Sequence, residues 1–289
     1  MLLDIVFNAF NGLIQGSFYA LMAIGLSLIL GLNGVINFAH GTFMALAGYF
    51  AFTLVPYTGF WGALVLGPIL AGAIGYIVEQ LIIRRLYLRD PLYSLLATFG
   101  LALIMQDLLR TIWGAQGLPL AIPDFLNQPV SNTYFFVTGY RLLVVALAVI
   151  STGALFATLR FTRLGVRIRA GNADLETIAA LGVNIYLLRS ANFVLGIMFA
   201  GLAGILAAGQ LGLTPTMGDQ LIMPSFVAIV VGGVGSLFGS LVGGLIIGIA
   251  SGVTTAFFPA ASEVVIYLIM GLTLIIRPRG LFGQEGLFE

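Results

Sequence analysis

Long apolar runs, broken at intervals by short polar or charged stretches, set the pattern of this chain. A helix that crosses roughly 30 Å of hydrocarbon needs about 20 residues, so dividing the runs by that length predicts about eight membrane spans. The seventh run is too long for one simple crossing, and the eighth is short. The predicted spans are 8–30, 35–55, 60–83, 92–112, 141–160, 190–212, 225–257 and 263–276.

Composition supports this division. Hydrophobic residues make up 60% of the 289 residues, charged residues only 8%, and the mean hydropathy is +1.10. A soluble domain needs polar faces on its helices, and most of these runs have none. The chain has no cysteine, so disulfides and thiolate chemistry are excluded. We therefore predict an all-α, polytopic membrane protein.

The arginines fix its orientation. All twelve basic residues are arginine, and ten of them fall in the 84–91 loop, the 160–189 segment and the C-terminal tail. The positive-inside rule places these three regions in the cytoplasm. The loop at about 113–140 must then be external, although Arg110 and Arg141 flank it.

Two segments interrupt the spans with glycine. Gly34 to Gly41 places Asn37 and the only histidine, His40, between two apolar runs. Polar groups at membrane depth need protein or water partners. We interpret the segment first as a helix break, and His40 either ties that break to a backbone carbonyl or contacts a solute.

The second interruption lies in the seventh run. Residues 226–236 are too few for a span and end in Gly232, Gly233 and Gly235, so we expect a half-helix that enters from outside and breaks, with 237–257 leading back out. Broken helices in corresponding halves are typical of transporter sites near the midplane. Two unrelated kinks are the alternative interpretation.

No catalytic or metal-binding constellation is present. The chain has no lysine and no GxxxxGK[ST] loop, so we expect neither an enzyme nor an ATP site of that type, and we expect no metal site. Candidate residues of a solute path are Asn37 and His40, with Gln106 and Gln210 as weaker candidates, because a polar side chain within a span can simply bridge neighbouring helices.

The segment 163–184 is the most informative soluble piece. Asn172 or Asp174 can cap a helix start, Glu176 favours its first turn, and Gly182 suits a left-handed C-terminal cap. The resulting helix of about eight or nine residues is too short to be stable alone. Its apolar side chains need a surface, either on this chain or on a partner.

This short helix resembles the EAA-type coupling loop by which permeases of ABC importers dock on their ATPases, although Thr177 and Ile178 stand where that pattern has alanines. Nearly the whole chain resembles the branched-chain amino-acid permease family, of the LivH type. The matching motifs are 35–41, Arg169-Ala170, Asp174-Leu175, 181–184, 193–196, 200–204, 231–236 and 277–283.

The resemblance implies a single permease domain over 1–289 with an ATPase-coupling loop at 163–184, in a bacterial inner membrane. It implies a second, LivM-like permease, two ATPase subunits that bind the ATP, and an extracytoplasmic binding protein. Branched-chain or other small amino acids, or solutes such as urea and amides, are the expected cargo. A self-sufficient carrier or channel is the alternative. The resemblance assigns coupling to Arg169, Asn172, Asp174, Glu176, Leu181 and Gly182.

Overall fold

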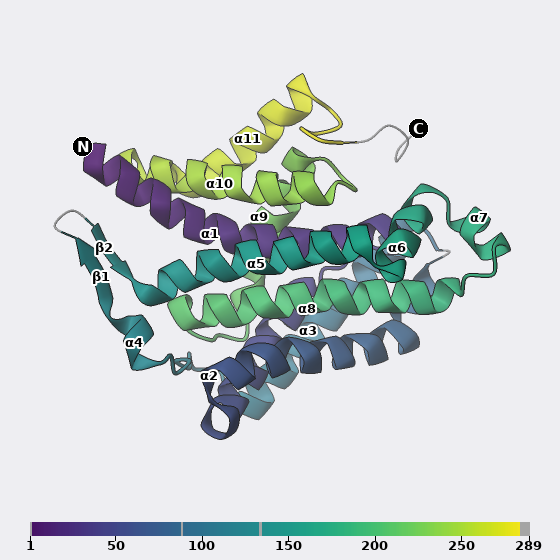
Figure 1. Cartoon of the computed structure of the whole chain (residues 1–289), viewed down its shortest axis with the longest axis horizontal. Coiled ribbons are helices and arrows are strands. Elements are labelled where there is room, and N and C mark those ends of the chain that lie inside the picture. The colour runs from purple at the N-terminus through teal and green to yellow at the C-terminus, as the bar shows by residue number, and fades with distance from the viewer. Residues whose placement is uncertain (1, 88, 133–134, 284–289) are drawn as a thin grey trace.

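The computed structural model describes residues 2–87, 89–132 and 135–283, and helices dominate it (Figure 1). A two-stranded antiparallel hairpin, β1 (Pro129–Asn132) and β2 (Phe135–Thr138), lies in the predicted external loop. The short turns are the π turn η1 (Ile29–Asn33), η2 (Ile83–Leu86) and η3 (Pro259–Ala261). The helices are α1 (Leu2–Leu28), α2 (His40–Leu81), α3 (Pro91–Trp113), α4 (Asp124–Asn127), α5 (Gly139–Phe161), α6 (Arg163–Ala173), α7 (Leu175–Ala180), α8 (Ile185–Leu211), α9 (Met217–Gly232), α10 (Leu237–Phe257) and α11 (Ser262–Ile276).

Helix α2 is two spans rather than one. Its 42 residues would extend about 63 Å if straight, but Gly59 inside it has φ 68° and ψ 175°, which is not helical. Before that kink, Met44 and Gly48 lie against Gly204 and Ala208 of α8; after it, Gly75 lies against Ile197. The two halves therefore run in opposite directions along α8. Seven described helices are long and apolar enough to cross a membrane, and this hairpin makes eight such segments, as predicted.

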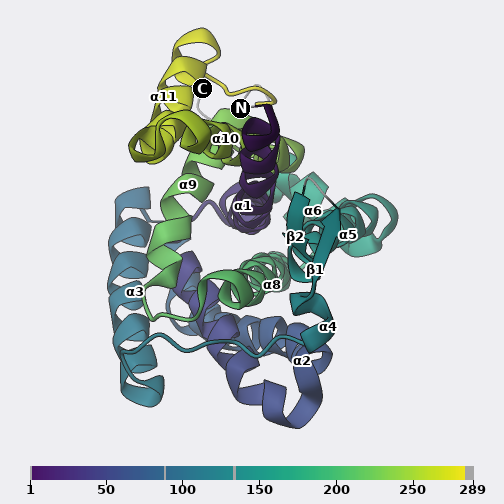
Figure 2. The ribbon, with the colours of Figure 1, turned by 90° about the vertical axis from the view of Figure 1, so that its left-hand side faces the viewer.

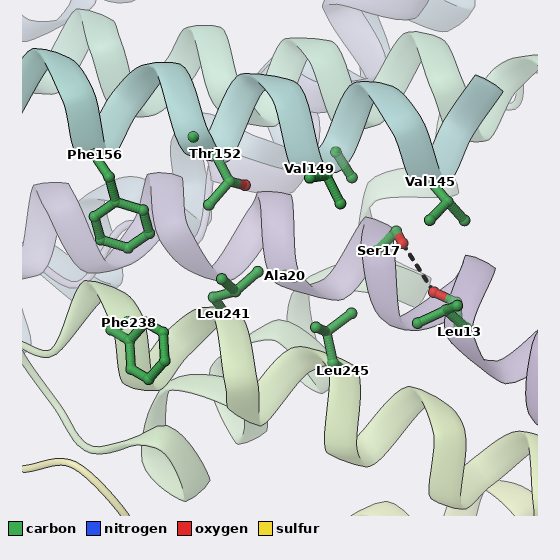
Figure 3. Close-up of a pocket in the computed structure, with 12 residues that line it drawn as sticks. Leu13, Ser17, Ala20, Val145, Val149, Thr152, Phe156, Phe238, Leu241 and Leu245 are labelled. Carbon is green, nitrogen blue, oxygen red and sulfur yellow. Dashed lines mark hydrogen bonds between the residues drawn. The ribbon is translucent and has the colours of Figure 1, made fainter. Parts of the chain in front are cut away.

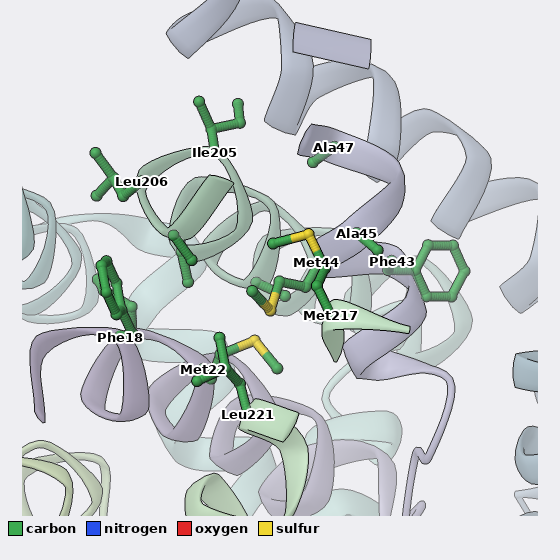
Figure 4. Packing of buried hydrophobic residues seen from close by; sticks show 14 of the residues in the cluster. Phe18, Met22, Phe43, Met44, Ala45, Ala47, Ile205, Leu206, Met217 and Leu221 are labelled. Carbon is green, nitrogen blue, oxygen red and sulfur yellow. The ribbon is translucent and has the colours of Figure 1, made fainter. Parts of the chain in front are cut away.

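Helices α1 and α8 form the centre of the molecule. Viewed along the long axis, they lie inside a ring of α2, α3, α5 and α11 (Figure 2). In the most apolar stretch of α1, 83% of residues are buried, against 6% for α11, so α11 presents its apolar side chains outward, as a lipid-facing helix does. The central core joins Phe18 and Met22 to Phe43, Met44 and Leu206 (Figure 4).

Glycines set the closest helix contacts. Gly248 of α10 packs on Gly16 of α1, where a Cβ would lie 2.3 Å from the Gly16 Cα. Gly12 meets Gly252 one turn farther along, so α1 and α10 run antiparallel at close range. Small residues at every fourth position permit this approach between membrane helices.

The helix before the second predicted break is longer than expected. We expected a half-helix over 226–236, whereas α9 begins at Met217 and ends at Gly232. Residues 217–225 include Asp219 and Pro224, which lower the hydropathy enough to hide the segment from a search for apolar runs. An acidic residue in the first turn nevertheless stabilises a helix. After the turn at 233–236, α10 runs back toward the end of the molecule where α1 starts, since Gly252 packs on Gly12.

The two ends of the molecule are distinct. Asn172 in the predicted cytoplasmic segment lies beside Gly31 in the π turn that follows α1. At the other end, Arg141 donates a 3.0 Å hydrogen bond to Asn11 near the start of α1. The start of α1 therefore lies at the end of the molecule that carries the external loop.

Candidate functional site

The first break is an irregular segment anchored to α3. After the π turn, Gly34 adopts φ 68°, and residues 34–39 are not helical. The Thr98 hydroxyl accepts a hydrogen bond from the Phe38 N–H at 3.1 Å and lies 3.1 Å from the Ile36 carbonyl oxygen. The Phe38 ring lies between Phe99 of α3 and Phe226 of α9. Gly41, expected within the break, instead lies in the first turn of α2.

Asn37 and His40 are both fully buried at this break. Neither the amide of Asn37 nor either ring nitrogen of His40 has a hydrogen-bond partner among the described residues. The imidazole nevertheless interacts with the Met22 backbone of α1, so a tie from His40 to a backbone carbonyl stays a prediction. The imidazole packs on Gly25 of α1, where a Cβ would lie 3.1 Å from two ring atoms. Leaving buried polar atoms unpaired costs about 1–3 kcal/mol each, so these side chains would gain free energy by forming a hydrogen bond.

Of the two glutamines, Gln106 bridges helices and Gln210 does not. Gln106 is 8% exposed, and its Nε2 donates a 2.8 Å hydrogen bond to Asp219 Oδ1, joining α3 to α9. Gln210 is exposed near the end of α8. Asp219 was not among the predicted path residues, because it lies outside the predicted span 225–257. Its acidic first-turn position was the available signal.

The second break is made of backbone contacts. Gly233 and Gly235 have φ of 108° and 84°, and Gly232 packs so tightly on Gly239 that a Cβ would lie 2.0 Å from its carbonyl oxygen. The C-terminal segment closes the turn, since the Leu281 N–H donates to the Val231 carbonyl at 2.9 Å and Phe282 to Gly232 at 2.8 Å.

The segment 163–184 folds as two short helices. We expected one helix of eight or nine residues, but α7 has six, and the unpredicted α6 precedes it. Arg169 and Asn172 belong to α6, so Asn172 caps nothing, whereas Asp174 accepts hydrogen bonds from the Glu176 and Thr177 N–H groups at 3.0 Å. Gly182 has φ 83°, the left-handed conformation that its position predicts.

The capping carboxylate and the apolar face of α7 have different partners. The Thr177 hydroxyl, together with the Thr177 N–H, holds the pKa of Asp174 below its usual value. Ile178 is 6% exposed and packs in a cluster that includes Leu32 of the π turn, whereas Leu181 is 77% exposed. Part of α7 therefore packs on this chain, whereas the following Leu181 is left on the outside, and a partner surface for it stays a prediction.

A buried carboxylate lies beside this segment. Glu79, at the end of α2, is fully buried and accepts hydrogen bonds of 2.6 Å from the hydroxyls of Tyr87 and Ser190. The Arg84 Nε lies 3.8 Å from Glu79 Oε1. Burial, aided by the bond to Glu79, raises the pKa of Tyr87, so its hydroxyl remains a donor.

The same network reaches the π turn. Asn33 donates to the Tyr87 hydroxyl at 2.8 Å and to the Arg189 carbonyl at 3.1 Å. Asn192 of α8 donates to the Asn33 side-chain oxygen at 2.9 Å and to the Leu28 carbonyl at 2.6 Å. A cavity of about 410 Å³ lies between this network and α7 and is lined by Arg84, Tyr87, Leu175, Glu176, Ala179, Ile185, Tyr186 and Arg189.

A contrasting apolar groove runs between α1, α5 and α10 (Figure 3). Its volume is about 360 Å³, and Phe156, Phe238 and Leu245 line it. The Ser17 hydroxyl in its wall donates to the Leu13 carbonyl of its own helix at 2.9 Å. This groove therefore offers a polar molecule few hydrogen-bond partners and is suited to hydrocarbon.

These features define a class. Eight apolar crossing segments, two non-helical interruptions and two short helices beside the arginine-rich end define a multi-pass membrane protein. Among the described residues no group of three or more histidine, cysteine or carboxylate side chains could hold a metal ion. Irregular backbone at membrane depth is tolerated only within protein or beside water, and this favours transport.

Comparison with known proteins gives the family. Residues 8–276 match the family model "Branched-chain amino acid transport system / permease component". The chain belongs to this family of permeases, and its relatives are transport subunits rather than enzymes.

Individual relatives agree. The permease protein LivH of the high-affinity branched-chain amino acid transport system of Escherichia coli K12 is 30% identical over 95% of this chain and 94% of its own length. The LivM permease of the same strain is 27% identical over 91% of this chain and 67% of its own. Among solved structures, PsaBC from Streptococcus pneumoniae in complex with Fab is similar over 92% of this chain and 89% of that one, with a TM-score of 0.47 and 15% identity.

Proposed function

We propose that the chain is a permease subunit of a binding-protein-dependent ABC importer in a bacterial inner membrane. In this proposal it forms half of a path for branched-chain or other small amino acids, or related solutes such as urea and amides. The membership in the permease family and the LivH relative support the class. The LivM relative favours pairing with a second, homologous permease, while a homodimer is the other outcome.

One observation carries the mechanism. The α6–α7 segment packs on the π turn that precedes the first break, because Leu32 lies against Gly171 of α6 and Asn172 lies beside Gly31, while Ile178 of α7 packs on Gly171 in the same cluster. π-helical turns are rare and frequent at functional sites. A movement of α7 driven by a partner ATPase would therefore reach the segment 34–39 without an intervening flexible loop.

Under this mechanism two ATPase subunits dock on α6 and α7 and bind the ATP, because this chain has no loop of the GxxxxGK[ST] type. Arg169, Asn172, Asp174, Glu176, Leu181 and Gly182 supply or shape that docking surface. ATP binding closes the ATPases, α7 moves, and the helices rock so that the path opens to one side at a time. An extracytoplasmic binding protein delivers the solute to the external end.

Asn37 and His40 are the proposed path residues near the break. Their polar atoms are buried and have no partner among the described residues, which suits a site that forms hydrogen bonds with a passing solute. Gln106 contributes through its bond to Asp219, whereas the exposed Gln210 has a weaker claim.

Reconstitution tests the proposal. The chain, a LivM-like permease, both ATPases and the binding protein are placed in proteoliposomes, and uptake of labelled leucine is measured with and without ATP. We expect uptake only when all components and ATP are present. Concentrative uptake by the chain alone, without ATP or binding protein, would instead show a self-sufficient carrier and overturn the proposal.

A further inference from the structure

The cavity beside α7 has no occupant assigned to it so far. It lies between α7, the turn η2 and the start of α8, at the end of the molecule that carries α6 and α7 (Figure 1). Its volume of about 410 Å³ is within the range of small-molecule sites. Arg84 of η2 and Arg189 of α8 both line it. Neither arginine belongs to the solute path or to the ATPase-docking residues proposed above.

The two guanidinium groups meet at one turn of α8. The Arg84 Cζ lies 5.0 Å from the centroid of the Tyr186 ring, and its Nη2 donates a 3.3 Å hydrogen bond to the Ser190 hydroxyl. Arg189 and Ser190 follow Tyr186 by three and four positions, so these side chains emerge on the same face of the helix. Arg84 therefore lies against the turn that carries Arg189.

Both arginines keep hydrogen-bond donors unused. The Nε atoms of Arg84 and Arg189 are buried and have no hydrogen-bond partner among the described residues. The Arg189 guanidinium stacks on Tyr87, with its Cζ 4.5 Å from the ring centroid. A guanidinium carries five N–H donors in a planar fork that fits the oxygens of a phosphate or carboxylate. The cavity therefore offers donors to an anion.

The nearby carboxylates leave an excess of positive charge. Glu79 lies 3.8 Å from the Arg84 Nε and already accepts hydrogen bonds from the Tyr87 and Ser190 hydroxyls, so it offsets one arginine. Glu176 of α7 lines the cavity but is exposed, and water weakens its field. The exposed Arg85 of η2 adds a further positive charge beside Arg84.

The surroundings of the cavity match the level of lipid headgroups. Leu81 and Ile82, just before Arg84, and Leu187, just after Tyr186, are exposed apolar side chains. Tyr186 itself is 60% exposed, and tyrosine is enriched where a membrane meets water. The arginines of the 84–91 loop mark this as the predicted cytoplasmic side. A molecule that combines an anionic group with acyl chains would fit both parts of this surface.

We propose that Arg84 and Arg189 bind the phosphate group of an anionic phospholipid of the cytoplasmic leaflet. The headgroup occupies the cavity, and the acyl chains lie along the exposed apolar side chains beside it. Basic pockets between membrane helices on this side of a membrane are suited to such headgroups. Because Leu175 and Ala179 of α7 line the same cavity, the bound headgroup also holds α7 against α8. The inference goes beyond the proposed function and does not depend on which solute is transported.

Native mass spectrometry of the purified full chain in detergent tests the site through the apparent Kd for added lipid. The probes are phosphatidylglycerol, phosphatidylcholine with the same acyl chains, and inorganic phosphate. We expect phosphatidylglycerol to bind more tightly than phosphatidylcholine, and Arg189→Gln to weaken phosphatidylglycerol binding alone, about tenfold. Arg85→Gln is the matched control, because it removes the same charge from η2 at a side chain that does not line the cavity. It should bind phosphatidylglycerol as wild type does.

Glu176→Gln guards against misfolding, because it should act in the opposite direction. Removing a negative charge from the lining should tighten phosphatidylglycerol binding, which a damaged fold would not do. Equal phosphatidylglycerol affinity in wild type, Arg189→Gln and Arg85→Gln, or no preference over phosphatidylcholine, would overturn the inference.

Two further outcomes would assign the cavity to a different occupant and also overturn the inference. Inorganic phosphate that displaces phosphatidylglycerol at an equal concentration would show a site for a free anion rather than for a lipid. Normal phosphatidylglycerol binding by Arg189→Gln, together with loss of the co-purifying ATPases, would show that Arg189 contacts an acidic group of an ATPase.

Discussion

The two helix breaks look alike in sequence and differ in structure. The segment 34–39 is irregular backbone held by the Thr98 hydroxyl, and the buried side chains of Asn37 and the following His40 have no hydrogen-bond partner among the described residues. The turn 233–236 contains no buried polar side chain and is closed by hydrogen bonds from Leu281 and Phe282. The first break carries polar side chains without hydrogen-bond partners, whereas the second is a close-packed backbone turn. Similar glycine spacing therefore does not make the two breaks equivalent.

The largest effect should come from filling the second break. Gly232→Val would place a Cβ 2.0 Å from the Gly239 carbonyl oxygen, and backbone cannot yield as a flexible side chain does. We expect loss of the folded complex, measured by size-exclusion chromatography with fluorescence detection. Gly271→Val is the control, because nothing lies within 4 Å of its Cβ position. A monodisperse Gly232→Val complex at wild-type yield would show that the backbone of the second break can shift to admit a side chain.

The first break should respond in function rather than in stability. Asn37→Ala and His40→Ala break no hydrogen bond within the described chain, so the free energy of unfolding should fall only by the cost of the cavity that each truncation leaves. Uptake by the reconstituted importer should nevertheless fall about tenfold while the ATPases still co-purify. Unchanged uptake in both variants would remove these residues from the path. The first break would then, like the second, have only a structural role.

A smaller effect should follow from loosening the anchor of the first break. Thr98→Val keeps the volume but leaves the Phe38 N–H without its acceptor, at a cost of about 1–3 kcal/mol. The thermal unfolding midpoint of the complex should fall. Thr111→Val is the control on the same helix, since among the described residues its hydroxyl bonds only to the Asp107 carbonyl of α3. Equal midpoints for the two variants would mean that the break needs no anchor.

The smallest effect should be local to α7. Gly182→Val meets no atom within 4 Å, so its cost of about 1–2 kcal/mol is backbone strain at φ 83° alone. We expect weaker ATPase docking and less solute-stimulated hydrolysis, with Gly182→Asn retaining more activity because asparagine tolerates this conformation. Normal coupled hydrolysis with Gly182→Val would count against α7 as the element that moves the first break.

Local patterns predicted the elements that local physics controls. Apolar run length predicted the spans, including the hairpin hidden within α2, and the Asp174 cap and the Gly182 conformation followed from position. Helices α6 and α9 were harder to predict from the sequence. Helix α6 is rich in arginine and α9 begins with Asp219, so neither begins as an apolar run, and both are stabilised by packing against the π turn, α10 and the C-terminal segment.

By itself, the sequence determined that this chain is a helical, multi-pass member of a permease family, because hydropathy, arginine placement and ordered motifs are local properties of the chain. The tertiary structure alone decided which polar groups are bonded. Thr98 and Gln106 bond to residues more than fifty positions away, and Glu79 bonds to the distant Ser190 as well as to nearby Tyr87, with Arg84 beside it. Asn37 and His40 find none among the described residues. Hydrogen bonding depends on distances of a few ångströms between distant segments, and no local pattern encodes them.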